Sequence, residues 1–263
     1  MLPSPNSNMR ASVGIIGFGA FGRLIAQHLA PHTSLRAYDP FVPAGVFAEH
    51  GAMGVDLPEA AHCSVVILAT PVSDLDKAVD AVSPHLLQGT VVVDVGSVKT
   101  LPVEIMLRGL PPHVAILATH PLFGPQSARG GIRGLKIAVC PVRGRRGLRA
   151  AAFLRRVLGL EVILTTPEAH DREAAAVQGL THLIAKVLVA MEPLPTRMTT
   201  RSFELLMEAV GLVRHDAPGV FQAIEELNPY AAGVRQRFFA LAAQLDAGLA
   251  GHRSLIAGIE KGT

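Results

Sequence analysis

The glycine-rich stretch "GFGAFG" constrains the fold more than any other part of the sequence. It directly follows the apolar run "SVGII" and opens the helical pattern "FGRLIAQHLA". A glycine turn between a strand and a helix lets the chain reverse sharply and lets a phosphate approach the first amides of the helix. The stretch therefore predicts a nucleotide site at the start of an α/β domain, formed by Gly17, Phe18, Gly19, Ala20, Phe21 and Gly22.

Apolar runs and helical patterns then alternate along the first part of the chain. Continuous Val/Ile-rich runs of this kind are typical of parallel strands buried on both faces. We expect residues 11–166 to form a doubly wound Rossmann-type domain with a parallel sheet. The expected strands are "SVGIIGFG", "LRAYDP", "SVVILAT", "TVVVDVGS", "VAILATHP", "LKIAVCPV" and "LEVILTTP".

The pattern changes at residue 167, after which apolar residues recur only at helical spacing. Residues 167–263 are expected to form an all-helical domain, with a loop at "PLPTRMTT" and a last long helix that starts near "NPY". Residues 1–10 are expected to be a disordered leader. No internal repeat is present in the sequence.

Composition excludes several classes of protein. Hydrophobic residues make up 49% of the 263 residues, enough for a sizeable core. Cys63 and Cys140 lie in apolar runs and indicate buried hydrophobes rather than a disulfide or a metal site. The basic cluster "VRGRRGLRAAAFLRR" lacks the interleaved aromatic residues of a nucleic-acid platform. With no signal sequence, and only an interrupted apolar stretch at 174–191, we expect a cytoplasmic protein that binds neither nucleic acid nor membrane.

An acidic residue points to the cofactor. Asp39 ends the second expected strand, 17 residues after Gly22, where a carboxylate would accept hydrogen bonds from a ribose hydroxyl. The same carboxylate would repel the 2′-phosphate of NADP, and no arginine follows in "DPFVPAG". The sequence therefore predicts NAD. A flavin, S-adenosylmethionine or a glycine turn without any ligand are the alternatives.

Three later strands end in residues that suit a reaction centre. They contribute Thr70 and Pro71, then Ser97 and Lys99, and finally His120. Carboxyl ends of parallel strands meet at one edge of the sheet, where the nicotinamide half of a dinucleotide would lie.

His120 is the expected catalytic base at this edge. Pro121 cannot continue the ladder and so leaves the imidazole at the lip of the sheet, where it can accept a proton as hydride leaves an alcohol carbon. Ser97 is expected to bond the same oxygen, and Lys99 to attract an anionic substrate. Capping of a helix and of a turn explains Ser97 and Lys99 as well.

Four segments in this order carry a resemblance to a known family: "GFGAFG", "DVGSVK", "THPLFGPQS" and "HDREAAAVQGLTHL". The chain resembles the prephenate/arogenate dehydrogenases of tyrosine biosynthesis from Val13 to about Arg237. In "TRSFELL" and "ELNPYA" it is similar to the arogenate dehydrogenase branch. The resemblance implies hydride transfer from the hydroxyl-bearing ring carbon to NAD, loss of carbon dioxide and aromatisation. It also implies a homodimer through the C-terminal helices.

The resemblance assigns further residues. His120 would be the catalytic histidine with Ser97 as its partner, His170 would lie near the cofactor, and His182 would lie near the substrate. Arg201 would clamp a substrate carboxylate, with Arg197 as the alternate. In the turn after His120, Gln126 and Ser127 would add hydrogen bonds to the substrate, although turn stabilisation explains both equally.

Two other functions remain open from the sequence. One is a β-hydroxyacid or imine dehydrogenase of the same architecture, for which Lys186 is the candidate lysine. The other is a catalytically idle NAD-binding partner protein. The sequence leaves undecided the choice between prephenate and arogenate, feedback inhibition by tyrosine, and the strictness of NAD over NADP.

Overall fold

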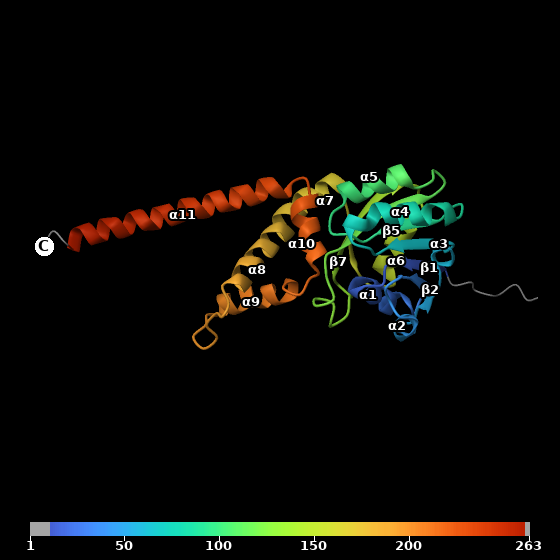
Figure 1. Ribbon diagram of the computed structural model, residues 1–263, viewed down its shortest axis with the longest axis horizontal. Coiled ribbons are helices and arrows are strands. Elements are labelled where there is room, and N and C mark those ends of the chain that lie inside the picture. Colours follow the sequence, from blue (N-terminus) through green and yellow to red (C-terminus); the bar gives the residue numbers. More distant parts are fainter. Residues whose placement is uncertain (1–10, 261–263) are drawn as a thin grey trace, which may run out of the picture.

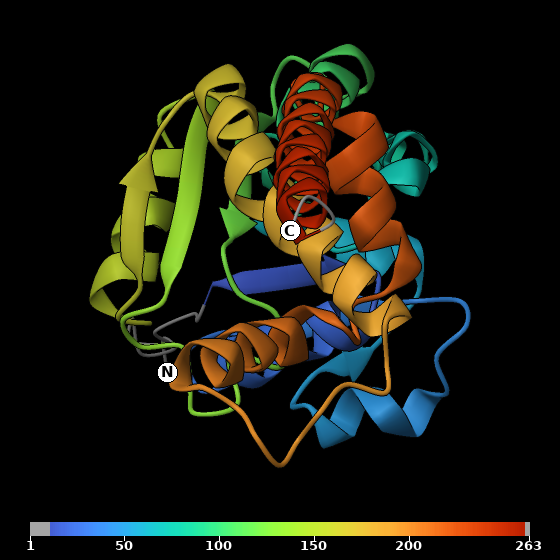
Figure 2. The same ribbon diagram turned by 90° about the vertical axis from the view of Figure 1, so that its left-hand side faces the viewer.

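The computed structural model describes residues 11–260, and the side chains of residues 11–250. The expected leader at 1–10 lies outside the described residues. The described chain has a sheet domain and a helical region from which one long helix projects (Figure 1). Seen from the side of that helix, the helical region lies in front of the sheet domain (Figure 2).

An eight-stranded sheet forms the centre of the first domain, in the order β3-β2-β1-β4-β5-β6-β7-β8. All seven expected strands are present, and the two-residue β3 is an addition that the sequence pattern did not show. The strands are β1 (Ser12–Ile16), β2 (Ser34–Tyr38), β3 (Met53–Gly54), β4 (Val65–Leu68), β5 (Val91–Asp94), β6 (Ala115–Pro121), β7 (Lys136–Arg143) and β8 (Glu161–Leu164).

The expectation of an all-parallel sheet is corrected at one junction. β6 and β7 are antiparallel, whereas every other pair of neighbours is parallel. The chain runs from β6 to β7 through residues 122–135 without a helix. A parallel pair needs a crossover, usually helical, while an antiparallel pair does not.

Helices cover both faces of the sheet and form two separate cores. One core contains apolar residues of α1, α2 and α6, and the other contains those of α3, α4 and α5. The helices are α1 (Ala20–Leu29), α2 (Ala44–Glu49), α3 (Leu57–Ala61), α4 (Leu75–Val82), α5 (Thr100–Gly109) and α6 (Gly147–Arg156), with short 3-10 turns at Val72–Asp74 and Ser83–His85. This arrangement brings the carboxyl ends of β1, β4, β5 and β6 to one edge.

The region after β8 is helical, as expected. Two π turns, η3 and η4, interrupt stretches that the periodicity predicts as single helices, and π turns recur at functional sites. The elements are α7 (Pro167–Ala174), η3 (Ala175–Gly179), α8 (Leu180–Ala190), α9 (Arg201–Val213), α10 (Pro218–Gln222), η4 (Ala223–Leu227) and α11 (Ala231–Glu260). The expected domain boundary at 167 coincides with the start of α7 and stays a prediction.

The helical stretch Pro167–Ala190 is long and apolar enough to cross a membrane, judged by length and composition alone. It also carries the buried polar residues His170, Asp171 and His182. The absence of a membrane-spanning segment therefore stays a prediction.

Candidate active site

The glycine turn has the geometry that a dinucleotide requires. Gly17 has φ of +93°, and a Cβ there would lie 2.8 Å from the Ala69 carbonyl carbon. A Cβ on Gly22 would collide with the Gly17 carbonyl oxygen, whereas one on Gly19 would meet nothing within 4 Å. The turn thus excludes side chains where it packs and leaves space above Gly19, where a pyrophosphate would approach the backbone.

Two polar side chains flank this turn. Asp39 Oδ2 accepts a hydrogen bond from the Phe18 amide at 2.7 Å, and its Oδ1 accepts one from the Phe41 amide at 2.9 Å. The Asp39 side chain is partly exposed and retains lone pairs for a further donor. The Thr70 hydroxyl is buried without a hydrogen-bond partner, and the Thr70 backbone lies against the turn at Gly17. These residues fit a ribose and a pyrophosphate.

The turn that follows β6 lies next to the glycine turn. The rings of Phe21 and Phe123 are in tilted contact with centroids 6.4 Å apart. Because Phe123 is three residues after His120, this contact joins the candidate nucleotide site to the end of β6. The two expected halves of the site are therefore neighbours.

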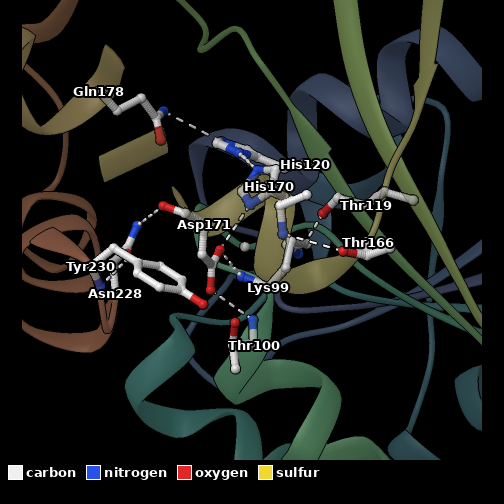
Figure 3. Close-up of polar contacts among 12 residues, drawn as sticks. Lys99, Thr100, Thr119, His120, Thr166, His170, Asp171, Gln178, Asn228 and Tyr230 are labelled. Atoms are coloured by element: carbon white, nitrogen blue, oxygen red, sulfur yellow. Dashed lines mark hydrogen bonds and ion pairs between the residues drawn. The ribbon is translucent and has the colours of Figure 1, made fainter. Parts of the chain in front are cut away.

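His120 is the last residue but one of β6, because the pairing with β7 continues through Pro121, contrary to the expectation that Pro121 ends the ladder. His120 also does not stand open at the lip of the sheet. Its residue is only 3% exposed because the helical region covers it. His120 Nδ1 is 2.8 Å from His170 Nε2, and Gln178 Nε2 is 3.4 Å from His120 Nε2 (Figure 3). The expected position at an exposed edge is thus corrected to a covered position between sheet and helices.

A carboxylate anchors this histidine pair. His170 Nδ1 is 2.8 Å from Asp171 Oδ1, which also accepts from the Lys99 amide at 2.7 Å, while Oδ2 accepts from the Thr100 amide at 2.8 Å. Burial raises the pKa of Asp171, but the hydrogen bonds from His170, Thr100 and Lys99 outweigh it, so the pKa lies below the usual value. Asp171 is therefore ionised and caps the first turn of α5 from outside the sheet domain.

The electrostatics of His120 make it a neutral acceptor. Burial is the largest cause that holds the pKa of His120 well below its usual value, and electrostatic interactions with the neighbouring His170 and Lys99 lower it further. A neutral imidazole keeps one nitrogen lone pair. At neutral pH His120 can consequently receive a proton.

The second histidine of the helical region lies one step further along. His182 Nδ1 is 3.0 Å from the Gln178 carbonyl oxygen, and His182 Nε2 is 3.2 Å from Asp216 Oδ2. The two ring nitrogens of His182 thus lie against a carbonyl oxygen and a carboxylate oxygen, which accept hydrogen bonds. A Cβ on Gly124 would lie 3.8 Å from Asp216 Oδ1, so Asp216 also reaches the turn after His120.

Lys99 has a different role from the one that the sequence predicts. Its side chain is fully buried, with Nζ 2.5 Å from Asp94 Oδ1 and 2.6 Å from the Thr119 carbonyl oxygen. A side chain committed in this way does not meet a substrate carboxylate. We reassign Lys99 from substrate binding to a buried ion pair that joins the ends of β5 and β6.

Arg201 is not brought to the histidine cluster. It begins α9, is 67% exposed at its side chain and pairs with Glu204 and Glu208 of its own helix. Asp216 follows the other end of α9, about 20 Å along the helix axis. Arg197 is exposed in the preceding loop. The structure therefore does not support Arg201 as the carboxylate clamp.

The roles expected of several other residues stay predictions. Ser97 is partly exposed and has no hydrogen-bond partner among the described residues, so its hydroxyl is free for a ligand. Ser127 Oγ bonds both the amide and the carbonyl of Gly124, which is the turn-stabilising alternative. Gln126 is partly exposed, and Pro71 is exposed. Lys186, the candidate lysine of the alternative enzyme, is exposed and lies over the Phe221 ring.

Sequence reasoning missed Gln178, Asp216 and the capping role of Asp171. The sequence offered one usable signal, the polar Gln178 one helical turn before His182 on an otherwise apolar stretch. Cys63 and Cys140 are buried as expected, and burial raises the pKa of Cys140 to about 12. Among the described residues, no group of three or more His, Cys, Asp or Glu could hold a metal ion.

Comparison with known proteins decides the family. The family model described as "Prephenate dehydrogenase, nucleotide-binding domain" matches residues 49–188, a range that includes Ser97, His120, His170 and His182. The chain belongs to the prephenate dehydrogenase family. The matched range covers the sheet domain from β3 to β8 and continues into the helical region.

Relatives and solved structures agree with this membership. Arogenate dehydrogenase 1 of Arabidopsis thaliana is 31% identical over 89% of this chain and 38% of its own length, and arogenate dehydrogenase 2 is 29% identical over 83% and 64%. This chain thus spans 38% of the length of the first of these plant proteins and 64% of the second. The prephenate dehydrogenase of A. aeolicus, solved with hydroxyphenyl propionate and NAD+, has a TM-score of 0.73 at 19% identity, covering 95% of this chain and 94% of that one. Synechocystis arogenate dehydrogenase has a TM-score of 0.66 at 18% identity, covering 92% and 93%. At these identities the structures show a shared fold.

Proposed function

We propose that this protein is an NAD-dependent dehydrogenase that oxidises and decarboxylates a cyclohexadienyl acid, prephenate or arogenate, in tyrosine biosynthesis. One observation carries the proposal. A neutral His120, backed by His170 and Asp171, ends the strand next to a glycine turn that fits a dinucleotide. Membership of the prephenate dehydrogenase family and the names of the plant relatives support the substrate class.

The residues would act in a short sequence of steps. When bound, NAD supplies the acceptor for the hydride, and Gly17, Gly19, Gly22, Asp39 and Thr70 would hold it. His120 Nε2 takes the proton of the substrate hydroxyl, displacing the long contact from Gln178. A hydroxyl that loses hydride from its carbon becomes a protonated carbonyl, which is strongly acidic, so even a weakly basic imidazole suffices. Carbon dioxide then leaves as electrons flow toward the new carbonyl, and the ring becomes aromatic.

Asp39 should set the preference for NAD. Replacing Asp39 with Asn removes the charge that would repel a 2′-phosphate, and like-charge contact costs several kcal/mol. We expect the ratio of kcat/KM for NADP over NAD to rise at least about tenfold. Initial rates with both cofactors would measure this. An unchanged ratio would show that Asp39 does not face the ribose.

Asp216 favours arogenate as the substrate. Its carboxylate is partly exposed, reaches toward the turn after His120 and keeps lone pairs beyond the contact with His182. Such a group attracts the ammonium of an amino-acid side chain and repels the keto acid. We therefore propose that kcat/KM is higher for arogenate than for prephenate.

Parallel assays of the two acids test this choice. Asp216→Asn should lower kcat/KM for arogenate by about tenfold, the value of one charge-assisted hydrogen bond, and leave prephenate turnover less affected. Asp80→Asn, an exposed change on α4, is the matched control. Equal effects of Asp216→Asn on both acids would contradict the assignment.

We also propose that the protein forms a homodimer. We expect the dimer to lie in the cytoplasm and not to bind a membrane. α11 is about 45 Å long, and its C-terminal part projects from the body (Figure 1). This helix exposes Phe239, Leu241, Leu245 and Leu249. A second copy laid along this helix would bury these side chains, and closed two-fold dimers are common. Sedimentation equilibrium should give twice the chain mass, and a monomer at micromolar concentration would refute the dimer.

A further inference from the structure

A buried chain of polar contacts leads from His120 through His170 to Asp171. We propose that Asp171 and His170 are positioning residues that fix His120 in one tautomer, with the hydrogen on Nδ1 and a bare Nε2. The proposal deepens the proposed function and differs from the earlier prediction that His170 contacts the cofactor.

The Asp171 carboxylate determines which nitrogen of His170 carries a hydrogen. Ionised Asp171 accepts hydrogen bonds and donates none. Its two oxygens accept hydrogen bonds from the Lys99 amide, the Thr100 amide and His170 Nδ1, at distances of 2.7–2.8 Å. His170 must therefore carry a hydrogen on Nδ1. The side chains of His170 and Asp171 are 4% and 0% exposed, so water does not compete for this bond.

The position of the hydrogen on His170 in turn determines that on His120. The charge of Asp171 is stabilised by two amides at the positive end of the α5 dipole. With its hydrogen on Nδ1, His170 offers the lone pair of Nε2 as an acceptor. Because this nitrogen is 2.8 Å from His120 Nδ1, the hydrogen between them belongs to His120.

With its hydrogen on Nδ1, neutral His120 has no hydrogen on Nε2. Its neighbour is the Gln178 amide nitrogen at 3.4 Å, a donor at a long distance that a substrate hydroxyl can replace. In the reaction the substrate O–H bond breaks and an N–H bond forms on Nε2, while the hydride leaves with its electron pair for NAD. The positive charge that appears on His120 is stabilised through His170 by Asp171.

The relay also orients the ring. The amides of Lys99 and Thr100 donate hydrogen bonds to Asp171 and so join the start of α5 to α7 (Figure 3). Together with the contact between His170 and His120, these bonds hold the His120 ring in one orientation. Loss of this orientation affects the chemical step rather than cofactor binding. The proposal therefore predicts a kcat effect.

Nitrogen NMR of protein with 15N-labelled histidine tests the tautomer directly. In the free wild-type protein at neutral pH, the His120 signals, assigned by their loss in His120→Asn, should show a protonated Nδ1 and an unprotonated Nε2. A hydrogen on His120 Nε2 would overturn the proposal. Since no substrate is used, this result stands or falls independently of the proposed activity.

Kinetics separate positioning from cofactor contact. His170→Leu removes the acceptor for His120 Nδ1, and we expect kcat to fall about 100-fold with little change in the KM for NAD. His170→Gln keeps a carbonyl acceptor and should recover at least about tenfold of that loss. His113→Gln, at a histidine bonded to the Leu86 carbonyl away from the site, is the control and should be unaffected. A rise in the KM for NAD with kcat unchanged would refute the proposal, and so would failure of glutamine to rescue. The glutamine variant and the NMR measurement keep the test decisive if the leucine variant does not fold.

Discussion

Replacing His120 with Asn is expected to lower kcat for NADH formation by about 10²–10⁴-fold, the usual contribution of a general acid–base group. Asparagine fills a similar volume but cannot take the hydroxyl proton. Because His120 is neutral and buried in the wild-type protein, its removal leaves no uncompensated charge. Steady-state assays with arogenate and NAD would measure the loss.

The control for this variant is its stability and its affinity for NAD. Circular dichroism should show an unchanged fold, and titration with NAD should show near-normal binding, because the glycine turn is intact. Turnover close to that of the wild type would contradict the role of His120. It would favour a hydroxyacid dehydrogenase that relies on a lysine, although Lys186 lies exposed over Phe221.

The second large effect concerns stability. Lys99→Met should lower the free energy of unfolding by about 3–5 kcal/mol, the cost of breaking a buried ion pair by removing one partner. Asp94 would be left buried without the ammonium that lies 2.5 Å away, and its Oδ2 already lacks a partner. Urea unfolding followed by circular dichroism would measure the change.

Two further measurements identify the cause of this loss. Burial raises the pKa of Asp94, and Lys99 opposes this shift. In Lys99→Met the folded pKa lies above the unfolded one, so the variant should be most stable at acidic pH and lose stability as pH rises through the folded pKa. The double variant Lys99→Met/Asp94→Leu should recover most of the loss. If Lys99 instead contacted substrate, the KM would rise while the stability stayed the same.

The sequence predicted most of the scaffold because its signals are local. Apolar runs located seven strands, and the glycine turn has the close backbone packing that its sequence predicted. The reversed direction of β7 escaped because "LKIAVCPV" has the same apolar pattern in either direction, and only the helix-free link from β6 hinted at it. Local patterns do not carry strand direction.

The candidate site was predicted less completely because its contacts join distant segments. Lys99 looked like a ligand from its place at a strand end, but its ammonium is buried against Asp94 and against the carbonyl of Thr119, 20 residues later on the next strand. Gln178 and Asp216 become relevant only when the helical region covers β6. Arg201 followed from a resemblance, and the packing of α9 places it elsewhere.

The most direct test of the account is the yield of both products from one reaction. Purified protein mixed with arogenate and NAD should form NADH and carbon dioxide in equal amounts, together with an aromatic amino acid, and His120→Asn should suppress both products in parallel. NADH formed without carbon dioxide, or no NADH from either cyclohexadienyl acid despite bound NAD, would contradict it.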